Sequence, residues 1–205
     1  MSLPLHEIIA ATLSATSVWL GTRRSPWCYP AGLVSVSVYI WVYFGARLYS
    51  EVLLQCIWIG MLVLGWWRWR QHLDRSGHVR VARLRGNAAA LHLAIGSSCG
   101  LALGYVMATH TPAALPWLDA MLTTLSLVAQ FWQNRRHAAT WWLWIVLDLV
   151  YVGMFINKHL FVTAVLYAGF VVLAAKGLRD WRRAAQQQAQ ADTTPQVPVG
   201  STPPG

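Results

Sequence analysis

Long apolar segments separated by short basic patches run through this chain and leave few folds open to it. Of its 205 residues, 56% are hydrophobic and 11% are charged, whereas a soluble domain carries about 25% charged residues. Each apolar block is near the ~20 residues that a helix needs to cross a bilayer. Backbone groups in lipid must pair internally, so the blocks are expected to be transmembrane helices. The predicted spans are residues 7–22, 29–46, 49–67, 88–110, 117–133, 141–156 and 159–176.

The basic residues predict how these seven spans are oriented. If the C-terminus lies in the cytoplasm and the spans alternate, 14 of the 16 Lys and Arg residues fall on the cytoplasmic side. Cytoplasmic loops carry such an excess, so the N-terminus is expected outside, and the net charge of +9 indicates topology rather than nucleic-acid binding. Arg47 and Lys158 fall outside. The cytoplasmic set is Arg23, Arg24, Arg68, Arg70, Arg75, Arg80, Arg83, Arg85, Arg135, Arg136, Lys176, Arg179, Arg182 and Arg183.

An internal repeat becomes visible when the chain is aligned with itself at an offset of 112 residues. The offset places Arg23-Arg24 on Arg135-Arg136, Tyr39 on Tyr151, Gly65 on Gly177 and Trp69 on Trp181. Matches at Arg, Gly and Trp are harder to obtain by chance than matches among apolar residues. Both halves begin outside and end inside, as parallel repeats do.

The repeat predicts an all-α membrane protein in a 3+1+3 arrangement like that of SWEET-type transporters. Residues 7–67 and 117–181 are the two three-helix repeats, and residues 88–110 are the linking helix, whose Gly96, Gly100 and Gly104 suit close helix packing. Residues 1–183 are expected to form a single transmembrane domain. Residues 184–205, rich in Gln, Ala, Thr and Pro, are expected to be a disordered cytoplasmic tail.

Polar side chains follow one face of the sixth span. Trp141, Trp144, Asp148 and Tyr151 are spaced i, i+3, i+7 and i+10, so they share a face of a helix. A carboxylate at this depth costs about 2.5–3.5 kcal/mol unless it faces water or a partner. The face is therefore predicted to line a cavity, whereas Trp142 is assigned to the interfacial belt.

Shorter polar stripes on three other spans are expected to face the same cavity. The fifth span carries Asp119, Thr123, Ser126 and Gln130; the third carries Glu51, Gln55 and Trp58; the second carries Gly32, Ser35, Tyr39 and Tyr43. Asp119 and Glu51 are expected near the outer surface. The predicted substrate-binding residues are Trp141, Trp144, Asp148, Gln130, Gln55, Tyr151, Thr123 and Tyr39.

These residue types favour a flat, polar and cationic organic ligand. Aromatic rings stack and attract cations, and amides can bind hydroxyl or carboxamide groups. The histidines form no HExxH motif and the cysteines no CxxC motif, so no metal or cofactor is expected. An intramembrane enzyme would need a converging catalytic set, and no catalytic residue is assigned.

The stretch Trp141-Trp142-Leu143-Trp144 followed by Asp148 resembles the WxxWxxxN/D signature of PnuC-type vitamin transporters. The segment from Gly65 to Trp69 is also similar to that family. The resemblance implies uptake of nicotinamide riboside by facilitated diffusion across a bacterial inner membrane, trapping by a cytoplasmic kinase, and substrate contact by Trp141 and Trp144. The family often has Asn where this chain has Asp148.

Several alternatives remain open at this point. Thiamine carries a positive ring and fits nearly as well as nicotinamide riboside, and related proteins carry riboflavin. A sugar, an intramembrane enzyme and a receptor-like protein rank below these, because fold alone does not determine function. The expected partners are a small-molecule substrate and the lipid bilayer, with no nucleic acid. Whether the chain forms a homo-oligomer is left open.

Overall fold

The computed structural model describes residues 5–45, 49–74, 76–111, 115–157, 159 and 161–193. The side chains of residues 5–8, 10 and 49–51 lie outside the described part. The described part of the chain is helical, apart from loops and two isolated β-bridges. Its helices are α1 (Leu5–Thr22), α2 (Cys28–Gly45), α3 (Tyr49–Arg70), α4 (Gly86–His110), α5 (Pro116–Asn134), α6 (Thr140–Asn157) and α7 (Phe161–Thr193).

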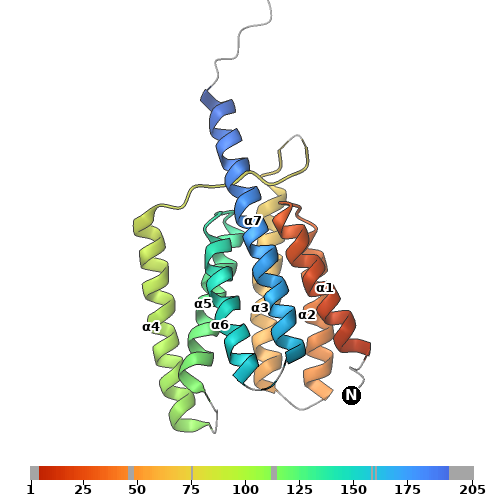
Figure 1. Cartoon of the computed structure of the whole chain (residues 1–205), viewed down its shortest axis with the longest axis vertical. Helices are drawn as coiled ribbons and strands as arrows, with labels where there is room; N and C mark the ends of the chain where they lie inside the picture. The colour runs from red at the N-terminus through yellow and green to blue at the C-terminus, as the bar shows by residue number, and fades with distance from the viewer. Residues whose placement is uncertain are drawn as a thin grey trace, which may run out of the picture.

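Each predicted span corresponds to one of these helices, so the expected seven-helix architecture is confirmed. Within the described residues, α2, α3, α4, α6 and α7 are long and apolar enough to cross a membrane. α1 and α5 carry more polar residues, and they run alongside the other helices in the same bundle (Figure 1). The polar side chains of α5 are tolerated because α5 packs against α3, α4 and α6.

The helix contacts have the symmetry that the repeat predicts. Within the first repeat α2 packs on α1 and α3, and within the second α6 packs on α5 and α7. Between the repeats α1 packs on α7 and α3 packs on α5. The same pairs of helices are in contact when α1, α2 and α3 are exchanged with α5, α6 and α7. A two-fold axis along the bundle accounts for this symmetry.

The linking helix α4 packs on α5 at the edge of the bundle (Figure 1). Its three glycines are buried against α5. A Cβ on Gly100 would come within 2.7 Å of Thr124 Oγ1, and one on Gly104 within 2.8 Å of Trp117. The doubled GxxxG pattern therefore allows the close approach of α4 to α5, as its spacing predicted.

The first part of the predicted tail is helical. α7 continues as a helix to Thr193, so the expectation of disorder is wrong for residues 184–193, and residues 194–205 lie outside the described part. Ala and Gln are good helix formers. The extension also contacts the α3–α4 loop, because Arg80 Nη2 lies 3.1 Å from Asp192 Oδ2 and Val81 N donates to Gln188 Oε1 at 3.2 Å.

The turns after α1 and α5 repeat each other in detail. Arg24 and Arg136, which are 112 residues apart, both adopt a left-handed backbone, with φ of 58° and 65°. The α3–α4 loop crosses both turns: Val79 N donates to Arg24 O at 3.0 Å, and Ala82 N donates to Arg136 O at 2.9 Å. These turns, the loop and the α7 extension lie at one end of the bundle (Figure 1). The basic residues predicted to be cytoplasmic gather there; Arg75, Arg47 and Lys158 fall outside the described residues.

Candidate substrate-binding site

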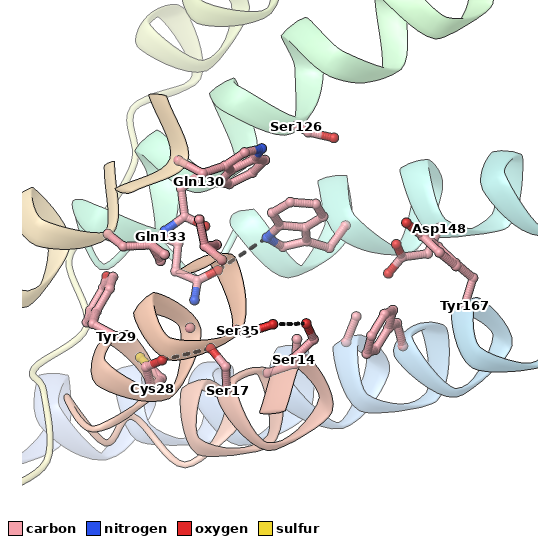
Figure 2. Close-up of a pocket in the computed structure, with 18 of the residues that line it drawn as sticks. Ser14, Ser17, Cys28, Tyr29, Ser35, Ser126, Gln130, Gln133, Asp148 and Tyr167 are labelled. Carbon is pink, nitrogen blue, oxygen red and sulfur yellow. Dashed lines mark hydrogen bonds between the residues drawn. The ribbon is translucent and has the colours of Figure 1, made fainter. Parts of the chain in front are cut away.

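A cavity of about 350 Å³ lies between the two repeats. This volume is in the range of sites for small organic molecules, about 300–1,000 Å³. Helices of both repeats contribute to its wall (Figure 2). Polar and aromatic lining residues are Ser14, Ser17, Tyr29, Ser35, Tyr39, Gln55, Trp58, Ser126, Gln130, Gln133, Trp141, Trp144, Asp148, Tyr151, Tyr167 and Phe170.

The predicted face of α6 forms one wall of this cavity. Trp141, Trp144, Asp148 and Tyr151 all line it. Trp141 is 2% exposed and Asp148 is 5% exposed, whereas Trp142 is 50% exposed on the outside of the bundle. The helical spacing thus separated the two tryptophans that line the cavity from Trp142, which faces away from it.

The two cavity tryptophans differ in their hydrogen bonding. Trp144 Nε1 donates to Gln133 Oε1 at 3.2 Å. Trp141 Nε1 is buried without a hydrogen-bond partner among the described residues. A buried donor without a partner costs about 1–3 kcal/mol, so this N–H suits an acceptor atom on a bound ligand.

Asp148 places a carboxylate in an aromatic part of the cavity. It forms no ion pair with any side chain that the structure describes. Tyr167 lies beside it (Figure 2), and the rings of Tyr167 and Tyr151, which both line the cavity, have centroids 5.0 Å apart. A carboxylate in such a setting favours a cation or a hydrogen-bond donor.

A buried amide network joins the repeats on one side of the cavity. Asn134 Oδ1 accepts hydrogen bonds from Tyr29 Oη at 3.1 Å and from Gln130 Nε2 at 2.9 Å. Asn134 Nδ2 donates to Met61 O at 2.8 Å. The network fixes the side chain of Gln130, which lines the cavity as predicted.

The first repeat contributes hydroxyl and amide groups. Ser14 Oγ and Ser35 Oγ are hydrogen-bonded at 2.8 Å, and Gln55 and Tyr39 line the same cavity. Ser17 Oγ donates to Cys28 O at 2.7 Å. Hydroxyl and amide groups can donate and accept, so they suit a ligand with several hydroxyl groups.

The structure therefore brings seven of the eight predicted residues together, and Thr123 is the exception. Thr123 does not line the cavity, because the face of α5 enters it further along the helix, at Ser126 and Gln130. Asp119 is exposed near the start of α5, as expected for a residue at the outer interface. The side chain of Glu51 lies outside the described residues.

Sequence reasoning missed several lining residues that the repeat could have revealed. Tyr29 is the equivalent of Trp141 at the 112-residue offset, and Tyr167 is the equivalent of Gln55. Ser14 and Ser126 form another equivalent pair. Applying the offset to each predicted residue would have found them. No comparable signal pointed to Gln133, which lies next to the basic turn.

The geometry agrees with comparisons to known proteins. Residues 4–183 match the family described as nicotinamide mononucleotide transporter. The riboflavin/roseoflavin transporter RibM of Streptomyces davaonensis is 27% identical over 85% of this chain and 83% of its own length. The nicotinamide riboside transporter PnuC of Escherichia coli is 25% identical over 78% of this chain and 77% of its own.

A solved structure supports the fold. The crystal structure of the vitamin B3 transporter PnuC superposes with a TM-score of 0.72 at 22% identity, over 87% of this chain and 81% of that chain. The family and these relatives are transporters rather than enzymes. Because the family match covers the cavity, the first six helices and most of α7, this chain is a multi-pass membrane transporter that belongs to the nicotinamide mononucleotide transporter family.

Proposed function

We propose that this chain carries nicotinamide riboside across the membrane. The observation that carries the proposal is the Asp148 carboxylate, which lies in the cavity beside Trp144 without an ion pair among the described residues. Nicotinamide riboside has a positively charged pyridinium ring. That ring can stack on an indole by a cation–π interaction, and the carboxylate can offset its charge.

The remaining lining groups suit the rest of this molecule. The ribose has hydroxyl groups and the pyridinium ring has a carboxamide, and Gln55, Gln130 and Ser35 provide matching donors and acceptors. The unpartnered Trp141 N–H can donate to the carboxamide oxygen. The relative from Escherichia coli is named a nicotinamide riboside transporter, which supports the same substrate for this chain.

Two other vitamins are the alternatives. Riboflavin is named for the Streptomyces relative, but its flavin ring carries no fixed positive charge to pair with Asp148. Thiamine has a positive thiazolium ring and would use the same carboxylate and indoles, but it has no ribose hydroxyl groups for Gln55 and the serines. The charge and the polar groups of the cavity therefore favour nicotinamide riboside as the substrate, followed by thiamine and then riboflavin.

We infer that transport runs down the concentration gradient of the substrate. Among the described residues, Asp148 is the one carboxylate that lines the cavity, and a cationic substrate would occupy it. A cytoplasmic kinase that phosphorylates the nucleoside would then keep the inward gradient. The proposed setting is a bacterial inner membrane, with the N-terminus outside and the basic end of the bundle in the cytoplasm.

Binding to the purified protein tests the substrate. Calorimetric titration with nicotinamide riboside, thiamine and riboflavin should give the tightest binding for nicotinamide riboside. Tighter binding of riboflavin would contradict the role given to Asp148, and tighter binding of thiamine would contradict the role given to the hydroxyl and amide groups.

Labelling of engineered cysteines tests the orientation. Ser76→Cys lies in the α3–α4 loop and should react with an impermeant thiol reagent in inside-out vesicles but not in intact cells. Both native cysteines that are exposed on the helices, Cys56 and Cys99, should be replaced by alanine first. Reaction in intact cells would reverse the proposed topology.

A further inference from the structure

Two tryptophans tie each repeat to the other at the basic end of the bundle. Trp69 of α3 and Trp181 of α7 are both fully buried. Trp69 Nε1 donates to Gln133 O at 2.9 Å, and Trp181 Nε1 donates to Gly21 O at 3.1 Å. The donors are 112 residues apart, and so are the acceptors. The two bonds are therefore symmetry equivalents, each running from the third helix of one repeat to the first helix of the other.

These tryptophans form a layer directly behind the cavity wall. Their ring centroids lie 5.6 Å apart. Tyr29 meets Trp69 edge-on at 5.0 Å, and Trp141 meets Trp181 edge-on at 5.8 Å. Because Tyr29 and Trp141 line the cavity, the tryptophan pair lies between the cavity and the basic end.

The α3–α4 loop covers this layer from the other side. Val79 is fully buried and belongs to the same cluster as Trp69 and Trp181. Its backbone is fixed to the turn after α1, since Val79 O also accepts from Arg24 Nη1 at 3.2 Å. A substrate passing from the cavity to the basic end along the axis must displace three layers: the Tyr29–Trp141 wall, the tryptophan pair and the Val79 cap.

We propose that Trp69 and Trp181 are the paired gate at the basic end of the transport path. Their two indole hydrogen bonds hold the repeats together there, and both must break when the repeats separate. The proposal rests on the transport role of the family and applies to any substrate of the cavity. Because the two hydrogen bonds are equivalent, loss of either indole N–H should open the gate to the same extent.

Distance measurement between spin labels tests the gate without any substrate. Arg23 and Arg135 are exposed equivalent positions on the two basic turns, so Arg23→Cys and Arg135→Cys can carry labels in protein lacking Cys56 and Cys99. Trp69→Phe and Trp181→Phe each keep a buried ring but remove one N–H. Each variant should raise the population with separated labels, relative to the population with close labels, roughly fivefold. The double variant should raise this population ratio about 25-fold.

Trp67→Phe is the matched control, because Trp67 lies on the same helix and is 59% exposed. It should leave the distance distribution unchanged. Equal distributions for Trp69→Phe, Trp181→Phe and this control would overturn the gate, and so would an effect of only one of the two. If a gate variant fails to fold, Val79→Ala provides the test, because it leaves both indoles in place. It should move the distance distribution in the same direction by a smaller amount. An unchanged distribution would count against the proposal.

A negative result here leaves the proposed substrate untouched. The distances are recorded without ligand, whereas the substrate is tested by binding to the unaltered protein. Weak binding of nicotinamide riboside with an intact gate response would overturn the substrate alone. Tight binding with no gate response would overturn the gate alone.

Discussion

The indole of Trp141 lies against the backbone of Gly177, so closely that a Cβ on Gly177 would come within 2.6 Å of Trp141 Cδ2. The equivalent pair in the first repeat is Gly65 and Tyr29, which are in similarly close contact. In both repeats, the third helix has a glycine where an aromatic residue of the second helix enters the cavity wall. The position of Trp141 in the cavity thus depends on the absence of a side chain at residue 177.

Gly177→Ala should therefore weaken substrate binding. The added methyl group would push Trp141 out of its position, and overpacking of this kind costs about 1–3 kcal/mol. Gly169→Ala is the control on the same helix, since a Cβ there would meet nothing within 4 Å. Calorimetric affinity and thermal unfolding of both variants test this. If Gly177→Ala had the same affinity and stability as Gly169→Ala, the close contact would not be needed for binding.

The tryptophans of α6 should divide into two classes. Trp144→Ala removes a ring from the cavity and should weaken binding by about 1–2 kcal/mol, or five- to thirtyfold. Trp142→Ala should change the affinity less than twofold, because Trp142 is half exposed outside the bundle and lies under Arg182. Titration of each purified variant with nicotinamide riboside separates the two. Equal losses at both positions in folded protein would contradict the assigned face.

Asp148→Asn tests what the carboxylate does. Asparagine keeps the shape and much of the hydrogen bonding but removes the charge, so affinity for nicotinamide riboside should fall by about 1 kcal/mol, roughly fivefold. Affinity for a neutral nicotinamide-like nucleoside should stay the same. The measurement is the affinity of both proteins for both ligands. A complete loss of binding in the folded variant would indicate an essential charge, and with it a different cationic substrate or a protonation step.

Most of the fold could be predicted because a bilayer imposes length and polarity on each helix. The ends of α2 and α4 lie within two residues of the predicted spans. The end of α7 was missed for a physical reason. A segment rich in Gln and Ala has the composition of a disordered tail but also high helix propensity, and its contact between Asp192 and Arg80 cannot be seen in the sequence.

The site was predictable where one helix carried a whole stripe. Trp141, Trp144 and Asp148 share a face by spacing alone, whatever the neighbouring helices do. Thr123 belongs to a similar stripe but does not line the cavity, because α5 reaches the cavity further along the helix, at Ser126 and Gln130. The gate could not be predicted either: Trp69 and Trp181 are visible as a repeat pair, but their acceptors are backbone carbonyls of the other repeat.

Uptake into proteoliposomes tests whether a cationic nucleoside moves down its concentration gradient through this cavity. Purified protein is reconstituted, and labelled nicotinamide riboside is added outside with or without an imposed proton or sodium gradient. We expect uptake that stops at the outside concentration, is unaffected by either gradient, and is inhibited more strongly by unlabelled nicotinamide riboside than by thiamine or riboflavin. Accumulation above the outside concentration that depends on an ion gradient, or uptake blocked best by riboflavin, would contradict it.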